Sequence, residues 1–199
     1  WFCDMNKIDV TQKFVYVGFW KRVWATLIDV VVFLPLMPVT LFLMDWTFKN
    51  RNILPAAIYG IVWYFLYCFL IVRFGGTPGK LIIKARIVDG NGRYLSWRGT
   101  LLRNILPIFM NLNSIAQQYT AISHSPKMSS IGFLEIGEIL NQYGGIYTKL
   151  SFALCFFLYA DVAVLLFNPK KRALHDFIAG SYVVTNKSRM EMLDKSQTN

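Results

Sequence analysis

The stretch ILPAAIYGIVWYFLYCFLIV, residues 53–72, contains no charged side chain. A helix needs about 20 mostly apolar residues to cross the hydrocarbon core of a bilayer, and this run supplies them. Its aromatic residues Trp63, Tyr64 and Tyr67 suit a helix face that is packed or lies at the interface. The sequence therefore predicts a membrane-spanning helix here, in a fold whose main solvent is lipid.

The composition of the whole chain agrees with this prediction. Hydrophobic residues make up 55% and charged residues 16% of the 199 positions, whereas a soluble domain is about 45–50% apolar. Lys and Arg outnumber Asp and Glu by 21 to 11. On so apolar a chain, this excess favours contact with anionic lipid headgroups and argues against nucleic acid as a partner. A large soluble catalytic domain is excluded, because the length suits one ordinary domain and three or four spans of about 20 residues each must fit within it.

Two further apolar runs flank the first one. Residues 24–44 are interrupted by Asp29, Pro35 and Pro38, and residues 150–167 are interrupted by Asp161. Residues 104–122 begin apolar and then become mixed with Asn and Gln, so hydropathy alone does not decide whether they cross. The expected fold class is an all-α integral membrane protein, a small bundle of about four transmembrane helices, with three as the alternative.

The distribution of basic residues favours four crossings. With four, residues 1–22, 73–103 and 168–199 all lie on one side of the membrane, and they hold 17 of the 21 Lys and Arg residues. The positive-inside rule makes that side cytoplasmic. With three crossings, the basic tail would face outward. A re-entrant or surface-lying segment at residues 104–122 is the alternative that remains.

The loops and ends carry weaker signals. Residues 80–97 have β-branched residues and a partial alternation that is broken by Asp89-Gly90-Asn91-Gly92, which favours a short cytoplasmic β-hairpin over an irregular loop. The outer segment, residues 123–149, has the apolar spacing of a short helix in the membrane interface. The expected organisation is a cytoplasmic N-terminal segment (1–18), a membrane domain (19–184) and a mobile polar tail (185–199).

Asp29 is a charged residue within an apolar run. Inserting a carboxylate deep in a bilayer costs about 2.5–3.5 kcal/mol of free energy. Arg22 lies seven residues earlier on the same helix face, about 10 Å away along the axis and too far for direct contact. Another group must therefore complete the site. The basic residues near the cytoplasmic boundary are the candidates: Arg73, Lys80 and Arg103. The alternative is that Asp29 only holds helices together.

Asp161 is a second acid within an apolar run. Two membrane acids and a basic entrance suit a path for cations or protons, since a buried carboxylate can exchange its proton for a cation. The simpler alternative is one hydrogen-bonded side chain near the helix end.

Two other motifs do not match a known binding or catalytic site. The loop at residues 74–80 lacks the glycine spacing and the Ser or Thr after the lysine that a phosphate-binding loop requires. His175 and Asp176 have no recognisable nucleophile beside them, and two histidines in the chain are too few for a metal centre. We therefore expect no catalytic residue, metal or cofactor. Asp176 is expected to pair with a cytoplasmic arginine.

Three motifs in order resemble the RDD family of membrane proteins. They are Arg22 followed by Asp29, the Gly-x-Thr-x-Gly-Lys loop at residues 75–80, and Leu174-His175-Asp176-x-x-Ala179-Gly180-x-x-Val183-Val184. The resemblance covers about residues 19–184. It implies that the family's arginine and two aspartates are Arg22, Asp29 and Asp176. Ser181 stands where the family usually has Thr, and residues 104–149 are longer and more polar than is typical.

The resemblance implies two hypotheses for an inner-membrane protein with cytoplasmic termini. In the first, the chain exchanges a monovalent cation for protons. Asp29 is then the carboxylate that binds the cation or proton, Arg22 is the charge that tunes this carboxylate, and Asp176 is a gate or counter-ion. In the second, the chain is a non-catalytic accessory or scaffold subunit, and the same polar cluster locks its structure. Arg73, Lys80, Arg103, Asp161 and His175 would support the cluster in either case. A homo-oligomer or a hetero-oligomeric complex is expected.

Overall fold

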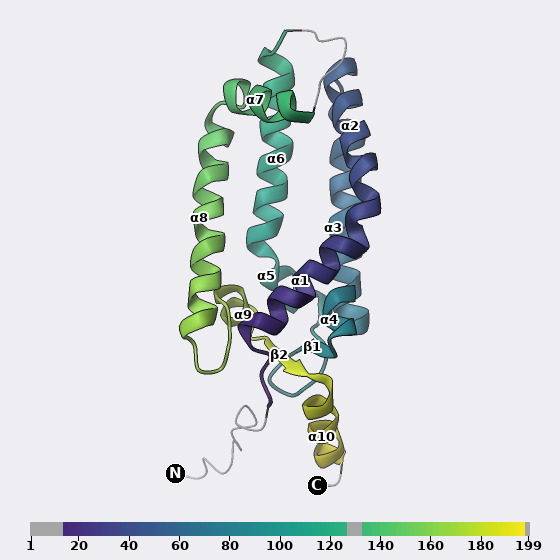
Figure 1. The fold of residues 1–199 in the computed structure, drawn as a ribbon, viewed down its shortest axis with the longest axis vertical. Helices are drawn as coiled ribbons and strands as arrows, with labels where there is room; N and C mark the ends of the chain where they lie inside the picture. The colour runs from purple at the N-terminus through teal and green to yellow at the C-terminus, as the bar shows by residue number, and fades with distance from the viewer. Residues whose placement is uncertain (1–13, 127–132, 198–199) are drawn as a thin grey trace, which may run out of the picture. The chain divides into compact units, whose positions relative to one another are not determined.

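The computed structural model describes residues 14–126 and 133–197 of the chain. The described helices are α1 (Phe19–Phe33), the 3-10 helix η2 (Leu34–Leu36), α2 (Met37–Asn50), α3 (Leu54–Phe74), α4 (Pro78–Ile82), α5 (Trp97–Arg103), α6 (Ile105–His124), α7 (Phe133–Tyr143), α8 (Ile146–Phe167), α9 (Leu174–Ile178) and α10 (Asn186–Gln197) (Figure 1). Two short strands, β1 (Ala85–Val88) and β2 (Tyr182–Thr185), pair antiparallel. The chain is mostly helical, as the sequence predicts.

Three helical segments in the described residues are long and apolar enough to cross a membrane: Phe19–Asn50, Leu54–Ile82 and Ile146–Phe167. They contain the three apolar runs of the sequence. The first is interrupted by η2, where Pro35 and Pro38 remove backbone donors from the helix. Residues 104–122 form helix α6, but α6 is too polar to meet the same criterion. Its helical structure is established, and its crossing of the membrane stays a prediction.

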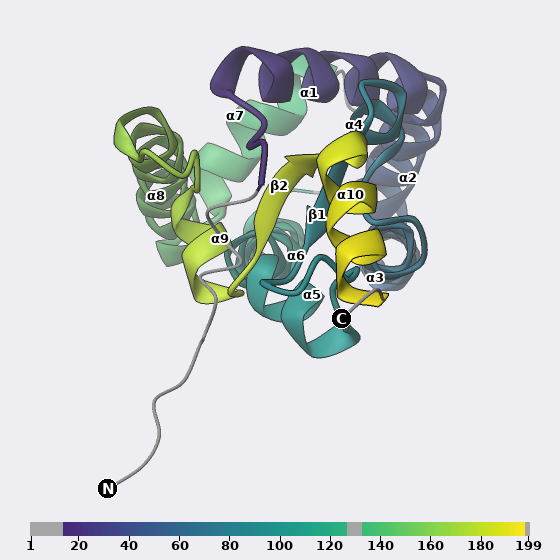
Figure 2. The same cartoon turned by 90° about the horizontal axis from the view of Figure 1, so that it is seen from below.

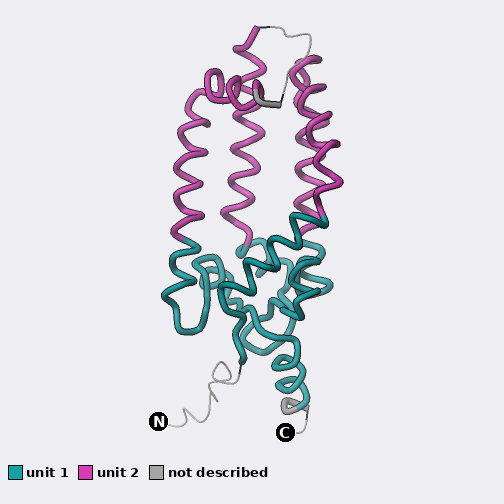
Figure 3. The backbone as a smooth tube through the Cα atoms, viewed as in Figure 1, with its two compact units in different colours: residues 1–32, 68–103, 161–199 teal, residues 33–67, 104–160 magenta. Residues whose placement is uncertain are grey.

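The chain divides into two compact units (Figure 3). The first, which we call the sheet unit, comprises residues 1–32, 68–103 and 161–199. The second, the helical unit, comprises residues 33–67 and 104–160.

The sheet unit is built around β2. β1 pairs with β2 from Ala85 opposite Thr185 to Val88 opposite Tyr182. Residues 15–17 run along the other side of β2, where the Val17 N–H donates to the Val183 carbonyl over 2.9 Å. Because α1 begins just after this segment and α9 ends just before β2, the ladder brings the start of α1 to α9.

Of the hairpin predicted within residues 80–97, the structure shows the turn and one antiparallel bridge. The turn exists, since the Asp89 N–H donates to the Arg93 carbonyl, but beyond it only an isolated bridge joins Val88 to Tyr94. β1 instead forms its ladder with β2, about a hundred residues away in sequence. Val183 and Val184 of β2 are fully buried beside β1, and burial of β-branched residues favours this pairing.

The C-terminal segment also differs from the expected mobile tail. Residues 186–197 form α10 (Figure 2), and Ser188 Oγ accepts a 2.9 Å hydrogen bond from the Val15 N–H. Arg189 lies over the ring of Tyr94 and donates to the Gly92 carbonyl. These long-range contacts leave no hydropathy signal. At the other end, residues 1–13 of the predicted N-terminal segment lie outside the described residues.

In the helical unit, α6 lies between α3 and α8 (Figure 1). Gly60 lets α3 approach α6, because a Cβ there would come within 3.2 Å of the Asn111 amide nitrogen. On its other face, α6 presents Asn113, whose Nδ2 donates to Ser151 Oγ on α8 over 2.7 Å. The predicted outer helix is α7, which packs Ile136 and Ile139 into a small apolar core with α6. Ile131, also predicted for that helix, lies outside the described residues.

Candidate functional site

Asp176 is the centre of a polar cluster in the sheet unit and is completely buried. It lies in the first turn of α9, where its Oδ2 accepts a 3.1 Å hydrogen bond from the Ala173 N–H. A carboxylate in this position satisfies a backbone donor that a helix start leaves open. Ser181 Oγ, just before β2, donates to Oδ1 over 3.2 Å. Asp176 therefore fixes the whole connection from α9 to β2.

Two arginines converge on the Asp176 carboxylate. Arg22 Nη1 lies 2.9 Å from Oδ2, and Arg103 Nη1 contacts Oδ1 and also Ser181 Oγ. Arg22 donates further to the Val17 carbonyl through Nε and to the Lys171 carbonyl through Nη2. This is the pairing of Asp176 with an arginine that the sequence predicts, with two partners where one was expected.

The arginines decide the charge state of Asp176. Burial raises the pKa of a carboxyl by desolvation, but the positive charges of Arg103 and Arg22 outweigh it, and the pKa of Asp176 lies well below its ordinary value. Asp176 is thus an anion at every physiological pH. The backbone carbonyl of the same residue accepts from Arg172, whose guanidinium also lies over the Phe177 and Tyr182 rings.

Asp29 does not join this cluster by a direct bond. Thr77 Oγ1 donates to its Oδ2 over 2.6 Å, and the Gly79 N–H donates to its Oδ1 over 2.7 Å. A hydroxyl and a backbone amide of another segment therefore complete the Asp29 site, and the three candidate basic residues do not bond to it in the described part of the chain. A Cβ at position 79 would lie 2.0 Å from the Ala25 carbonyl oxygen, so the backbone of the loop is pressed against α1. That proximity lets a hydroxyl and an amide satisfy the carboxylate.

The three other basic candidates have different outcomes. Arg103 is bonded to Asp176. Lys80 lies close enough to both aspartates, and to Arg22 and Arg103, to interact with them electrostatically. Arg73, in the last turn of α3, is exposed, and the described residues show no bond that brings it to the site.

Asp161 and His175 form a second pair within the sheet unit. His175 Nδ1 lies 2.6 Å from Asp161 Oδ2, and the His175 N–H donates to Oδ1 over 2.9 Å. Since a carboxylate only accepts, Nδ1 carries the proton. The other ring nitrogen, Nε2, lies 3.5 Å from Asp176 Oδ1. His175 therefore links an acid of α8 to the buried aspartate of α9.

Sequence reasoning did not assign Thr77, Gly79 or Ser181 to the site. All three lie within motifs that carry the family resemblance, which was the available signal. Their role depends on a hydroxyl or a backbone N–H that meets a carboxylate from another element. Such meetings are set by tertiary structure, and residue type alone does not reveal them.

The chemistry open to this arrangement is limited. In the described residues, no group of three or more His, Cys, Asp and Glu side chains is placed to hold a metal ion. Each of the three acids is held by donors from another segment of the chain. The site can therefore fix segments to one another, and the Asp161–His175 pair can also exchange a proton.

Comparisons with known proteins give one match. The RDD family model matches residues 16–180, which includes Arg22, Asp29 and Asp176. No curated protein and no solved structure matches the chain. With a match over most of its length and three helical segments suited to crossing a bilayer, the chain belongs to the RDD family and is a membrane protein.

Proposed function

We propose that this RDD family protein is a non-catalytic accessory or scaffold subunit of a membrane complex, and that its polar cluster is a structural lock. The observation that carries this proposal is the bonding of the three acids. Asp29, Asp161 and Asp176 each accept at least two hydrogen bonds from fixed donors. A transported cation would have to displace these donors.

The charge around the cluster supports the same role. Arg22, Arg103 and Lys80 surround Asp176 and Asp29. Their positive charges oppose the entry of another cation at Asp176 and Asp29. The same charges favour anionic lipid headgroups, which we propose as a partner of this face together with further protein subunits.

We place the protein in the inner membrane with both termini in the cytoplasm. Four crossings, with α6 as the third, put 17 of 21 basic residues on the cytoplasmic side. The bonding of α6 to its neighbours supports this topology. The amide nitrogens of Asn113 and Gln117 donate to Ser151 and Thr148 on α8, so these two donors of α6 are satisfied inside the helical unit, as membrane depth requires.

Purification in a mild detergent tests the scaffold role. The tagged chain is expected to retain one or more other proteins in constant ratio, and Asp176→Asn is expected to lose them as the lock opens. Glu138→Gln, a change at an exposed acid of α7, serves as the matched control and should retain them. A chain that purifies alone, as a monomer or homo-oligomer, contradicts the scaffold role.

Exchange of a monovalent cation for protons is the second candidate. The observation that favours it is the connection from Asp161 through His175 to Asp176, since two titratable groups in contact can pass a proton. Purified protein in liposomes is expected to move cations along a pH gradient, and Asp161→Asn should abolish the flux. Asp29→Asn tests the predicted ion-binding acid. Equal flux in wild type, both variants and protein-free liposomes contradicts transport.

A further inference from the structure

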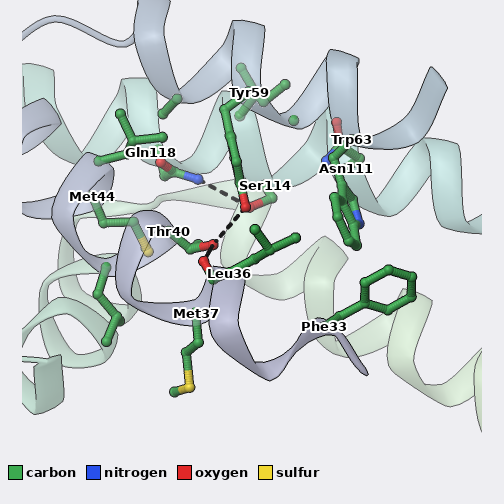
Figure 4. A pocket seen from close by; sticks show the side chains of 15 residues that line it. Phe33, Leu36, Met37, Thr40, Met44, Tyr59, Trp63, Asn111, Ser114 and Gln118 are labelled. Atoms are coloured by element: carbon green, nitrogen blue, oxygen red, sulfur yellow. Dashed lines mark hydrogen bonds between the residues drawn. The ribbon is translucent and has the colours of Figure 1, made fainter. Parts of the chain in front are cut away.

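A cavity of about 520 Å³ lies within the helical unit, between η2, α2, α3 and α6 (Figure 4). Its volume falls in the range of about 300–1,000 Å³ that small-molecule sites occupy. Most of the lining is apolar and includes Trp63 and Met37, while no charged residue belongs to it. Thr40 and Tyr59 come from helical segments suited to crossing the bilayer, so the cavity is at membrane depth.

Five polar side chains line this apolar cavity: Thr40, Tyr59, Asn111, Ser114 and Gln118. Thr40 donates its one hydroxyl proton to the Leu36 carbonyl, so the 3.1 Å contact with Tyr59 has the tyrosine as donor. Gln118 Nε2 donates to Ser114 Oγ over 3.2 Å. Figure 4 shows these groups directed toward one another.

The polar groups are not all satisfied by the protein. Gln118 is 91% buried, and its carbonyl oxygen has no hydrogen-bond partner among the described residues. The half-buried Asn111 amide likewise has none in the described part of the chain. Leaving a buried amide unpaired costs about 1–3 kcal/mol, and rotation about its soft terminal torsion turns either end of the Gln118 amide toward the cavity. Such groups at membrane depth indicate a ligand.

The unpaired groups define the chemistry of that ligand. The Gln118 carbonyl needs a donor, whereas the Asn111 amide nitrogen and the Ser114 hydroxyl need acceptors. A charged head is excluded, because no lining residue neutralises it and desolvation is expensive. We propose that this cavity binds an uncharged amphiphile that carries a hydroxyl group, of the monoacylglycerol class, with its head at Asn111 and Gln118 and its acyl chain along the apolar wall. The inference is independent of the proposed function.

Native mass spectrometry of the full chain tests the proposal with three lipids of equal acyl length. Monooleoylglycerol has donors and acceptors, methyl oleate has acceptors only, and oleate is charged. We expect one bound monooleoylglycerol per chain, with the other two at least about tenfold weaker, the loss expected for one unmade hydrogen bond or more. Equal binding of methyl oleate or of a phospholipid means that any acyl chain fills the cavity, and it overturns the proposal.

Variants locate the site. Gln118→Leu is expected to weaken monooleoylglycerol about tenfold and to leave the thermal unfolding midpoint equal or higher, because an unpaired buried polar group is removed. Gln117→Leu is the matched control. Gln117 belongs to the same helix but donates to Thr148 and the Leu140 carbonyl, and its loss should leave binding unchanged. If Gln118→Leu does not fold, Ser114→Ala replaces it. Unchanged binding in the folded variant overturns the proposal.

Discussion

At the scale of residues, the clearest feature is a buried aspartate held between two arginines. Asp176 is fully buried, and its carboxylate receives Arg22, Arg103, Ser181 and the Ala173 N–H. A buried ion pair adds little net stability by itself, because desolvation offsets the attraction. Removing one member of the pair lowers stability strongly, because the remaining charges stay buried without compensation.

Asp176→Asn should lower the free energy of unfolding by about 3–5 kcal/mol, because it leaves two buried guanidinium groups facing a neutral amide. Thermal unfolding in detergent, followed by circular dichroism, measures the change. The control Glu138→Gln, at an exposed acid, should change it by no more than about 0.5 kcal/mol. An Asp176→Asn midpoint equal to that of wild type contradicts the lock.

The pKa of Asp176 predicts a pH dependence of stability. Because the arginines hold this pKa below its unfolded value, the unfolded chain takes up the proton first as the pH falls. The stabilisation is full above the unfolded carboxyl pKa of about 4 and is lost as the pH drops toward the folded value. Arg22→Gln removes one of the two arginines and brings the folded pKa of Asp176 closer to its unfolded value, so the free energy of unfolding should fall less between pH 6 and acidic pH than in wild type. An identical fall in both proteins counts against this assignment.

At the scale of elements, the contact between α1 and the first turn of α4 depends on a glycine. The Gly79 backbone approaches the Ala25 carbonyl and donates to Asp29 at the same time. Only a residue without a Cβ permits both. The loop that resembles a phosphate-binding turn in composition therefore serves to receive a membrane aspartate.

Gly79→Ala should lower the free energy of unfolding by about 1–3 kcal/mol or more, because the new Cβ would overlap the Ala25 carbonyl and displace the loop from Asp29. The unfolding midpoint in detergent checks this. Gly90→Ala is the matched control, since its Cβ would meet no heavy atom within 4 Å. Similar midpoints for the two variants would mean that the approach is not tight.

At the scale of the whole molecule, the open question is on which side of the membrane each end lies. Four crossings place α7 outside and α10 in the cytoplasm, whereas three crossings, with α6 not inserted, place α7 in the cytoplasm and α10 outside. Both helices offer exposed positions, Gln142 and Lys187. The two topologies therefore give opposite results in one experiment.

Cysteine labelling in a variant lacking the native cysteines decides between them. With four crossings, Gln142→Cys reacts with a membrane-impermeant maleimide in intact cells, and Lys187→Cys reacts only after the cells are opened. The reverse pattern would establish three crossings and place the basic tail outside, against the charge rule.

The sequence alone determined the class of this protein and its spans, because a charge-free run of 20 residues is specific for lipid. It also indicated Arg22, Asp29 and Asp176 as residues of the polar site. Few charged residues lie in or beside apolar helices, because burying a charge there costs free energy.

The tertiary structure decided which groups satisfy those charges. It paired β1 with β2 in place of a local hairpin, ordered α10, gave Asp29 to Thr77 and Gly79, and left Arg73 exposed. The physical reason is the same in each case. Hydrophobic periodicity is a local property of the chain, whereas a hydrogen bond or a strand pair depends on two segments that meet only after folding.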